Sequence, residues 1–221
     1  MRSTFSFVLF ASLAACSSSP TTNPGNDGGG SDGPTQKSDS STTGGPSAAT
    51  VDLKESCPTF TPCGGSVEGT WDYTSGCAEL DLSQLKQACS GITISDTSAT
   101  VTGRVVFGAG QVNRTYTATG QAKLFVPAVC AQPAGGCTVL QSEIQSGGDT
   151  ATCTDDGNGG CNCNITSTTS DDKIDSYTVQ GDTIVTGDGN SYDFCVSGGS
   201  MTYRHSSGDS VEHGSFTLTK R

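Results

Sequence analysis

Apolar and polar residues alternate along several stretches of this chain, most clearly between Thr115 and Val126. The even positions there are small or largely apolar, namely Tyr116, Ala118, Gly120, Ala122, Leu124 and Val126. A period of two indicates a long β-strand with one buried face. The stretch from Val101 to Phe107 alternates in the same way, and Gly108-Ala109-Gly110 between the two predicts a hairpin turn.

The same alternation recurs in shorter segments toward the C-terminus. Their expected inward residues are Tyr192, Phe194, Val196, Met201, Tyr203, Phe216 and Leu218. Turns rich in Gly, Asn and Asp separate these segments, and Asp171-Asp172 is expected at another hairpin tip. Many short strands joined by such turns predict an antiparallel all-β fold, either a barrel or a sandwich.

Two segments depart from the period of two. Leucines recur at helical spacing between Glu79 and Ala88, and aliphatic residues do so between Thr138 and Gln145. Apolar residues three or four positions apart are typical of one helix face. We therefore expect two short helical insertions in the all-β fold.

The N-terminus has the pattern of an export signal. After the cationic Arg2, residues 5–14 form an apolar run. It is shorter than the ~20 residues that a membrane-spanning helix needs. The run ends in Leu13-Ala14-Ala15-Cys16, which resembles the bacterial lipobox. That resemblance implies cleavage before Cys16 and acylation of Cys16, and two or more acyl chains anchor a protein stably. The alternative is an ordinary signal peptide followed by an incidental cysteine.

Residues 17–49 contain no aromatic residue and no aliphatic residue larger than Ala. Such a segment cannot bury enough apolar surface to offset its ordering entropy, so we expect a disordered tether. The predicted organisation is a signal peptide at 1–15, a lipidated cysteine and tether at 16–50, and one folded domain at 51–221. Ser17 after the cysteine resembles the outer-membrane sorting pattern, which implies a lipid anchor in the outer membrane of a bacterial envelope.

The formal net charge is −11, from 22 acidic and 11 basic residues. This excess of negative charge argues against nucleic acid as a partner and against electrostatic binding to anionic lipid. The expected contact with the membrane is therefore the lipid on Cys16.

Ten cysteines remain beyond Cys16, and an even number in an exported chain predicts disulfides. They are Cys57, Cys63, Cys77, Cys89, Cys130, Cys137, Cys153, Cys161, Cys163 and Cys195. We expect the local pairs Cys57–Cys63, Cys77–Cys89 and Cys130–Cys137, with the other four pairing among themselves. Cys161 and Cys163 share one strand face and should bridge to different partners. A zinc site is the alternative, although the Cys-x-Cys spacing lacks the usual longer spacer.

Gly69-Thr70-Trp71 resembles the G-x-W signature of lipocalins, and the segments 192–196, 201–203 and 214–218 resemble their closing strands. With Cys63-Gly64-Gly65, the chain is similar to Cys-rich lipocalin-like lipoproteins of bacterial envelopes over about Cys63 to Arg221. The resemblance implies an up-and-down antiparallel β-barrel that holds one small apolar molecule. It also implies that Trp71 closes one end of the barrel and that Lys220 or Arg221 packs on it.

The inferred inward faces predict the lining of a ligand site, which comprises Phe107, Tyr116, Ala118, Ala122, Leu124, Phe194 and Tyr203. Ala118, Gly120 and Ala122 are small and would leave a hollow, and an eight-stranded barrel is just wide enough for one small ligand. In the alternative, the helix at 138–145 plugs this space, and the domain is a structural or interaction module. No cofactor is implied.

Patterns for catalysis and metal binding are weak. Gly208-Asp209-Ser210 lacks the flanking glycines of a nucleophile elbow. His205 and His213 flank that segment and fall on opposite faces in the expected hairpin register. The oxygen-rich stretch at 155–160 lacks the alternating ligands and distal Glu of an EF-hand loop. We therefore expect no enzyme activity and no bound metal, and a hydrolase ranks last.

The lipobox resemblance generates the first prediction. Cys16→Ala should yield protein without acyl mass that partitions into the aqueous phase of a detergent extraction, whereas the unsubstituted chain partitions into the detergent. Intact mass and phase partitioning of both forms check this. Unsubstituted protein that is aqueous and carries no acyl mass would contradict the lipoprotein assignment.

Overall fold

The computed structural model describes residues 45–207 and 214–221, which form ten strands and three short helices. The strands are β1 (Ala49–Lys54), β2 (Gly69–Glu79), β3 (Thr93–Gly108), β4 (Gln111–Val126), β5 (Thr150–Asp155), β6 (Cys161–Gln180), β7 (Thr183–Thr186), β8 (Ser191–Ser197), β9 (Ser200–Ser207) and β10 (Gly214–Lys220). The helices are α1 (Ser83–Ala88), α2 (Ala128–Ala131) and α3 (Cys137–Ser146). The predicted signal peptide, Cys16 and most of the predicted tether lie outside the described residues.

Eight of the described strands form a closed ring in the order β2, β3, β4, β6, β7, β8, β9, β10, with β10 pairing back to β2. Each neighbouring pair in this ring is antiparallel. The strands follow one another in chain order except that β5 is skipped. The prediction of a mostly β fold is confirmed.

Strand β1 breaks the antiparallel pattern that we predicted for the whole domain. It pairs antiparallel with β3 but parallel with β2. Parallel neighbours need a crossover connection, and the long segment 55–68 between β1 and β2 supplies it. Strand β1 begins at the buried Ala49, two residues before the predicted start of the folded domain at Val51.

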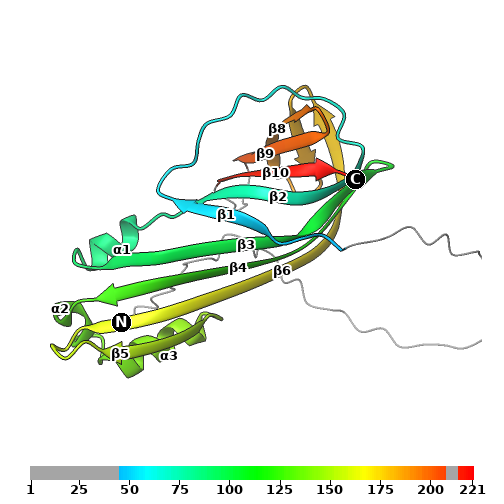
Figure 1. Ribbon diagram of the computed structural model, residues 1–221. Coiled ribbons are helices and arrows are strands. Elements are labelled where there is room, and N and C mark those ends of the chain that lie inside the picture. The colour runs from blue at the N-terminus through cyan, green and yellow to red at the C-terminus, as the bar shows by residue number, and fades with distance from the viewer. Residues whose placement is uncertain (1–44, 208–213) are drawn as a thin grey trace, which may run out of the picture.

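Three ring strands are much longer than the others: β3 and β4 have 16 residues each and β6 has 20. Their far halves leave the ring and, with β5, form a projecting sheet (Figure 1). Helix α3 packs on this projection, where its Leu140 and Ile144 form one buried cluster with Leu124 and Ile165. The domain thus has two cores, one inside the ring and one under α3.

The predicted hairpin between β3 and β4 is confirmed. Ala109 and Gly110 at its tip have φ angles of +52° and +73°. A two-residue hairpin turn with both central residues at positive φ matches the right-handed twist of the flanking strands. The inward positions of β4 that alternate in the sequence are buried or half-buried, as predicted.

The helix predictions hold in part. Helix α3 extends the predicted 138–145 by one residue at each end. Helix α1 begins at Ser83 rather than Glu79, because β2 continues through Glu79 and the Asp81 carboxylate then accepts the Ser83 amide N–H. Helix α2 was not predicted, since four residues are too few to show a period.

The expected hairpin tip at Asp171-Asp172 is wrong, because both residues lie in the middle of β6. The inward residues of β6 within the ring are polar or charged apart from Tyr177, so no apolar alternation marks this half of the strand. They are Ser167, Thr169, Asp171, Lys173, Asp175 and Tyr177.

All ten described cysteines form disulfides, as predicted, but the predicted local pairs are wrong. The bridges are Cys57–Cys77, Cys63–Cys195, Cys89–Cys130, Cys137–Cys161 and Cys153–Cys163. They join separate elements rather than closing single turns. Of the four cysteines expected to pair among themselves, only Cys153 and Cys163 do so. Cys161 and Cys163 do bridge to different partners.

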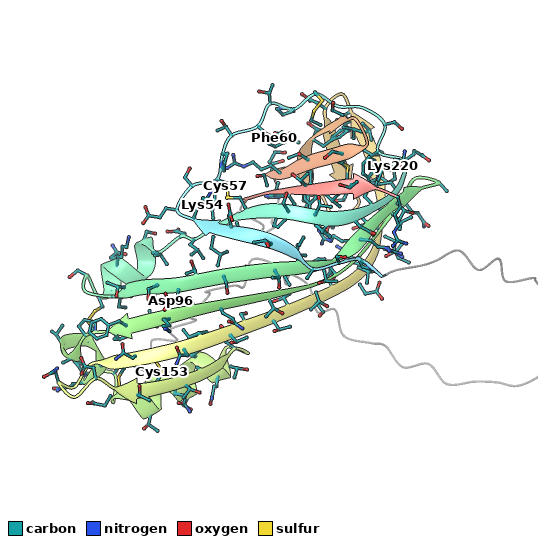
Figure 2. The ribbon with its side chains drawn as sticks, viewed as in Figure 1. Lys54, Cys57, Phe60, Asp96, Cys153 and Lys220 are labelled. Atoms are coloured by element: carbon teal, nitrogen blue, oxygen red, sulfur yellow. A yellow bond between two sulfur atoms is a disulfide. The ribbon has the colours of Figure 1, made fainter. Side chains whose placement is uncertain are left out.

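The bridges are spread over both parts of the domain; Cys57 lies by the ring and Cys153 on the projection (Figure 2). Cys63–Cys195 fastens the 55–68 crossover to β8, where the amide N–H groups of Cys63 and Gly64 also donate to the carbonyl of Phe194. No helix within the described ranges is both long and apolar enough to span a membrane.

The spacing of the bridges predicts unequal losses of stability. Cys63 and Cys195 are 132 residues apart, and Cys153 and Cys163 are 10 apart. In the chain-entropy treatment, these bridges contribute about 4–5 and about 2.5–3 kcal/mol. The double variant Cys63→Ala/Cys195→Ala should therefore lower the free energy of unfolding by about 2 kcal/mol more than Cys153→Ala/Cys163→Ala. Urea unfolding of both variants measures this, and an equal or reversed loss would contradict it.

Candidate functional site

The interior of the ring is divided by a partition of aromatic side chains. Tyr203 of β9 stacks on Phe216 of β10 with ring centroids 5.7 Å apart. One hydroxyl of the pair Tyr73 and Tyr203 donates to the other across 3.0 Å. Tyr116 and Tyr192 meet the two sides of this group edge to face. Tyr203 lines a cavity on each side of the partition, so the ring holds two hollows rather than one.

The first hollow, here called the charged cavity, has an apolar inner wall and a polar outer wall. The inner wall comprises Val105, Phe107, Val112, Ile184, Tyr192, Met201 and Tyr203, and the outer wall comprises Arg114, Lys173, Asp175, Thr186 and Asp188. The apolar side chains are at most 8% exposed, whereas the four charged ones are 20–37% exposed. The charges therefore lie on the solvent side of the cavity.

The charged cavity has a volume of about 60 Å³. An engineered apolar cavity of roughly 150 Å³ holds one benzene ring. The charged cavity therefore takes only part of a ring, and the rest of a bound molecule would lie along its exposed charged wall.

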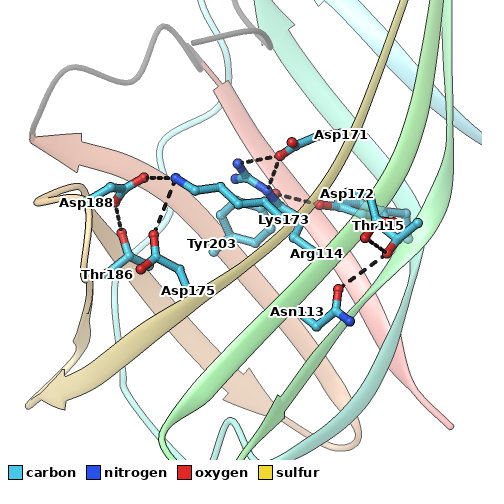
Figure 3. A network of polar contacts seen from close by, with 11 residues as sticks. Asn113, Arg114, Thr115, Asp171, Asp172, Lys173, Asp175, Thr186, Asp188 and Tyr203 are labelled. Atoms are coloured by element: carbon cyan, nitrogen blue, oxygen red, sulfur yellow. Dashed lines mark hydrogen bonds and ion pairs between the residues drawn. The ribbon is translucent and has the colours of Figure 1, made fainter. Parts of the chain in front are cut away.

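The charges of this wall form two ion-paired groups (Figure 3). Lys173 of β6 lies 2.6 Å from Asp188 and 3.3 Å from Asp175, measured from Nζ to the carboxylate oxygens. Arg114 of β4 lies 2.9 Å from Asp171. Asp171 is outside the cavity lining but paired to it. Partly buried charges are tolerated when they are paired in this way.

The pairing shifts two pKa values. Burial opposes ionisation of Asp188, but hydrogen bonds from Lys173, Thr186 and Asn190 outweigh it and lower the pKa of this carboxyl. The hydrogen bond to Asp188 raises the pKa of Lys173, against an opposing effect of burial. Both groups are therefore held in their charged forms at neutral pH.

The second hollow, here called the neutral cavity, has no charged residue in its lining. It has a volume of about 50 Å³ by the same measure. Its walls are Val51, Leu53, Tyr73, Ala78, Ala99, Thr100, Val101, Tyr116, Ala118, Thr119, Gly120, Ser167, Thr169, Tyr203 and Phe216. Ala118 and Gly120 of β4 supply the small wall that the sequence predicted, and Ser167 and Thr169 of β6 add hydroxyl groups opposite.

A glycine positions one of the partition residues. Gly103 of β3 pairs with Tyr116 of β4, and a Cβ on Gly103 would lie 2.6 Å from the Tyr116 Cβ. That separation is too close for any side chain, so glycine allows Tyr116 to stand against β3 beside the neutral cavity.

The predicted lining residues do not all lie around one cavity. Phe107 and Tyr203 line the charged cavity, and Tyr116, Ala118 and Tyr203 line the neutral one. Leu124 belongs to the core under α3, and Ala122 is buried without lining either cavity. Phe194 is fully buried in the ring core and lines neither cavity. Ala122, Leu124 and Phe194 therefore lie outside the linings of both cavities.

The predicted helical plug is wrong for the ring, because α3 packs on the projecting sheet and no α3 residue lines either cavity. Helix α3 fills the far end of the β4 face, around Leu124 and Val126. The hollow remains farther along the same face, at Ala118 and Gly120. The sequence patterns did not predict the charged wall, because its residues on β6 show no apolar alternation. The available signal was the charged residues at every second position of β6, Asp171, Lys173 and Asp175.

Trp71 is fully buried, and its indole N–H donates to the carbonyl of Val67 across 2.6 Å. The Lys220 ammonium lies 5.4 Å from the Trp71 ring centroid. Gly69 makes room for this contact, since a Cβ there would lie 2.8 Å from the Lys220 Cε. Of the two basic residues considered, Lys220 therefore packs on the ring, while Arg221 pairs with Asp72 at 2.8 Å.

The other candidate chemistry is not assembled in the described part of the chain. In residues 45–207 and 214–221, no group of three His, Cys, Asp or Glu residues is arranged to hold a metal ion. The carboxylates of Asp155 and Asp156 accept backbone N–H groups of their own turn. His205 packs edge to face on Tyr192. His213 and Gly208-Asp209-Ser210 lie outside the described residues.

Comparison with protein-family models, with curated proteins and with solved structures gave no match. The site is therefore interpreted from its own geometry.

The Lys173–Asp188 pair generates a prediction about pH. Because the pKa of Asp188 is lowered from 3.8, its contribution to stability is present above that pH and is lost as pH falls further. Because the pKa of Lys173 is raised from 10.5, its contribution is lost as pH rises beyond that value. Asp188→Asn should lower the free energy of unfolding at pH 7 by about 0.5–1 kcal/mol, since the pair is partly exposed. Urea unfolding at pH 7 and pH 2.5 should show this difference shrinking in acid.

Asp182→Asn is the matched control, because it removes the same charge from an exposed residue in the turn between β6 and β7. It should change stability less than Asp188→Asn at pH 7. If the loss of stability caused by Asp188→Asn grows as the pH is lowered, the predicted contribution of the Lys173–Asp188 pair is wrong.

Proposed function

We propose that this chain is a lipid-anchored protein of the bacterial envelope whose ring of strands binds a small, largely apolar molecule. The observation that carries the proposal is the pair of cavities inside the ring, apolar for the most part and each supplied with a few polar groups. Small-molecule sites have this composition.

We infer that the ring is an up-and-down β-barrel of the lipocalin type. Three observations support this: eight antiparallel ring strands in chain order with only β5 skipped, closure of β10 on β2, and a buried Trp71 beneath a basic residue of the last strand. Barrels of eight strands are just wide enough to hold one small ligand. The parallel strand β1 and the projecting sheet are additions to that plan.

The envelope location rests on the lipobox resemblance and on the cysteines. Five disulfides join all ten described cysteines, and disulfides persist in oxidising compartments outside the cytosol. Acylation of Cys16 would hold the ring near a membrane surface at the end of the 16–50 tether.

A structural or interaction module is the second candidate. The filling of the projection by α3 and the small volume of both cavities favour it. The two candidates differ in whether the space beside Ala118 is open in solution.

Ala118→Phe separates them. The new ring should occupy the neutral cavity, so that the free energy of unfolding changes by less than about 1 kcal/mol and binding of a neutral apolar probe there is lost. In a filled core the same overpacking costs roughly 1–3 kcal/mol. Urea unfolding and NMR titration with 2-phenylethanol measure the two effects.

Ala122→Phe is the matched control, since Ala122 is buried on the same face of β4 but lines neither cavity. It should cost roughly 1–3 kcal/mol. Equal losses for the two variants would favour the structural module.

A further inference from the structure

The two cavities offer different chemistry, and the difference indicates a ligand class. We propose that the charged cavity binds a small organic cation with one apolar end, of the size of a phenylalkylammonium ion. This inference rests on the proposed function, because it names the kind of molecule that the ring takes.

The apolar end is matched by the inner wall of the cavity. Val105 and Met201 are almost fully buried there, and Tyr203 closes the space toward the partition. A volume of about 60 Å³ takes only part of an aromatic or aliphatic ring, so the rest of the ring would lie toward the exposed charged wall. Burial of that ring would supply most of the affinity, as apolar contact does in small-molecule sites.

The sign of the charge follows from the outer wall. Both of its bases are already paired with carboxylates, Lys173 with Asp188 and Asp175, and Arg114 with Asp171. In the cavity lining, Arg114 and Lys173 balance Asp175 and Asp188, and Asp171, which pairs with Arg114 from outside the lining, brings this group of described residues to a net charge of −1. An anion would have to displace a carboxylate from Lys173 or Arg114 and would be repelled by this net charge, which attracts a cation.

Two further features favour a cation. Phe107, Tyr192 and Tyr203 present aromatic rings to the cavity, and a desolvated cation is attracted to the face of such a ring. The whole chain carries a net charge of −11, which raises the local concentration of cations around it.

The test compares three probes of nearly equal shape and different charge: 2-phenylethylammonium, 2-phenylethanol and phenylacetate. The Cys16→Ala chain is used because it needs no detergent. Backbone amide shifts in β6, β7 and β9 report binding beside the charged wall. At low salt the ammonium should bind about tenfold more tightly than the alcohol, and phenylacetate should bind most weakly. Salt should reduce the preference, as screening requires.

Variants test the charge count in both directions. Asp188→Asn makes the group neutral and should remove most of the ammonium preference, whereas Lys173→Met makes it −2 and should increase the preference. Asp182→Asn lowers the chain's negative charge equally, away from the cavity lining, and should leave the preference unchanged. The urea midpoint of each variant verifies that it is folded.

The outcomes distinguish this inference from the proposed function. If alcohol and ammonium bind equally, or if phenylacetate binds most tightly, the ring binds small molecules but the cation class is wrong. If none of the three probes shifts amides lining either cavity, the inference and the proposed function both fail.

Discussion

The pairing of β4 with β6 is the constraint on which the rest of the structure depends. All 16 residues of β4 pair with β6, from Gln111 opposite Ser176 to Val126 opposite Cys161. One half of this ladder closes the ring, and the other half carries the projecting sheet. Because side chains alternate along a strand, a single register decides which residues face inward in both places.

The two strands of this ladder determine which kinds of side chain face the ring interior. Strand β4 places small residues inside, at Ala118 and Gly120, whereas β6 places hydroxyl and charged groups there. Small residues leave space, and partly buried charges must be paired with one another. The neutral cavity and the ion-paired wall of the charged cavity are therefore two consequences of one pairing.

The disulfides have a different structural role from the strand pairing. They do not set the inward faces, since the strand register does that; four of the five fasten segments outside the strands, whereas Cys153–Cys163 joins paired residues of β5 and β6. The crossover at 55–68 is held by Cys57 and Cys63, and each of α1, α2 and α3 has a bridged cysteine at or near one end. A domain with few aromatic residues gains from bridges of this kind, because its apolar core is modest.

Residue patterns predicted those parts of the fold in which one strand face is apolar. The β3–β4 hairpin, the inward faces of β8 to β10, and Trp71 beneath a basic residue follow from alternation or from the G-x-W resemblance. The inward face of β6 could not be predicted in this way, because its inward residues Asp171, Lys173 and Asp175 are polar, as are most of the outward residues of this strand. Disulfide partners could not be predicted either, since they depend on which strands become neighbours in space.

The ring interior holds open apolar space beside Ala118 and beside Met201. A crystal structure of the domain under xenon gas tests it most directly, because xenon enters dry apolar cavities and is excluded from close-packed cores. We expect xenon density on one or both sides of Tyr203, with none in the core between α3 and β6. A ring interior in which side chains fill both positions, with no xenon bound, would contradict it.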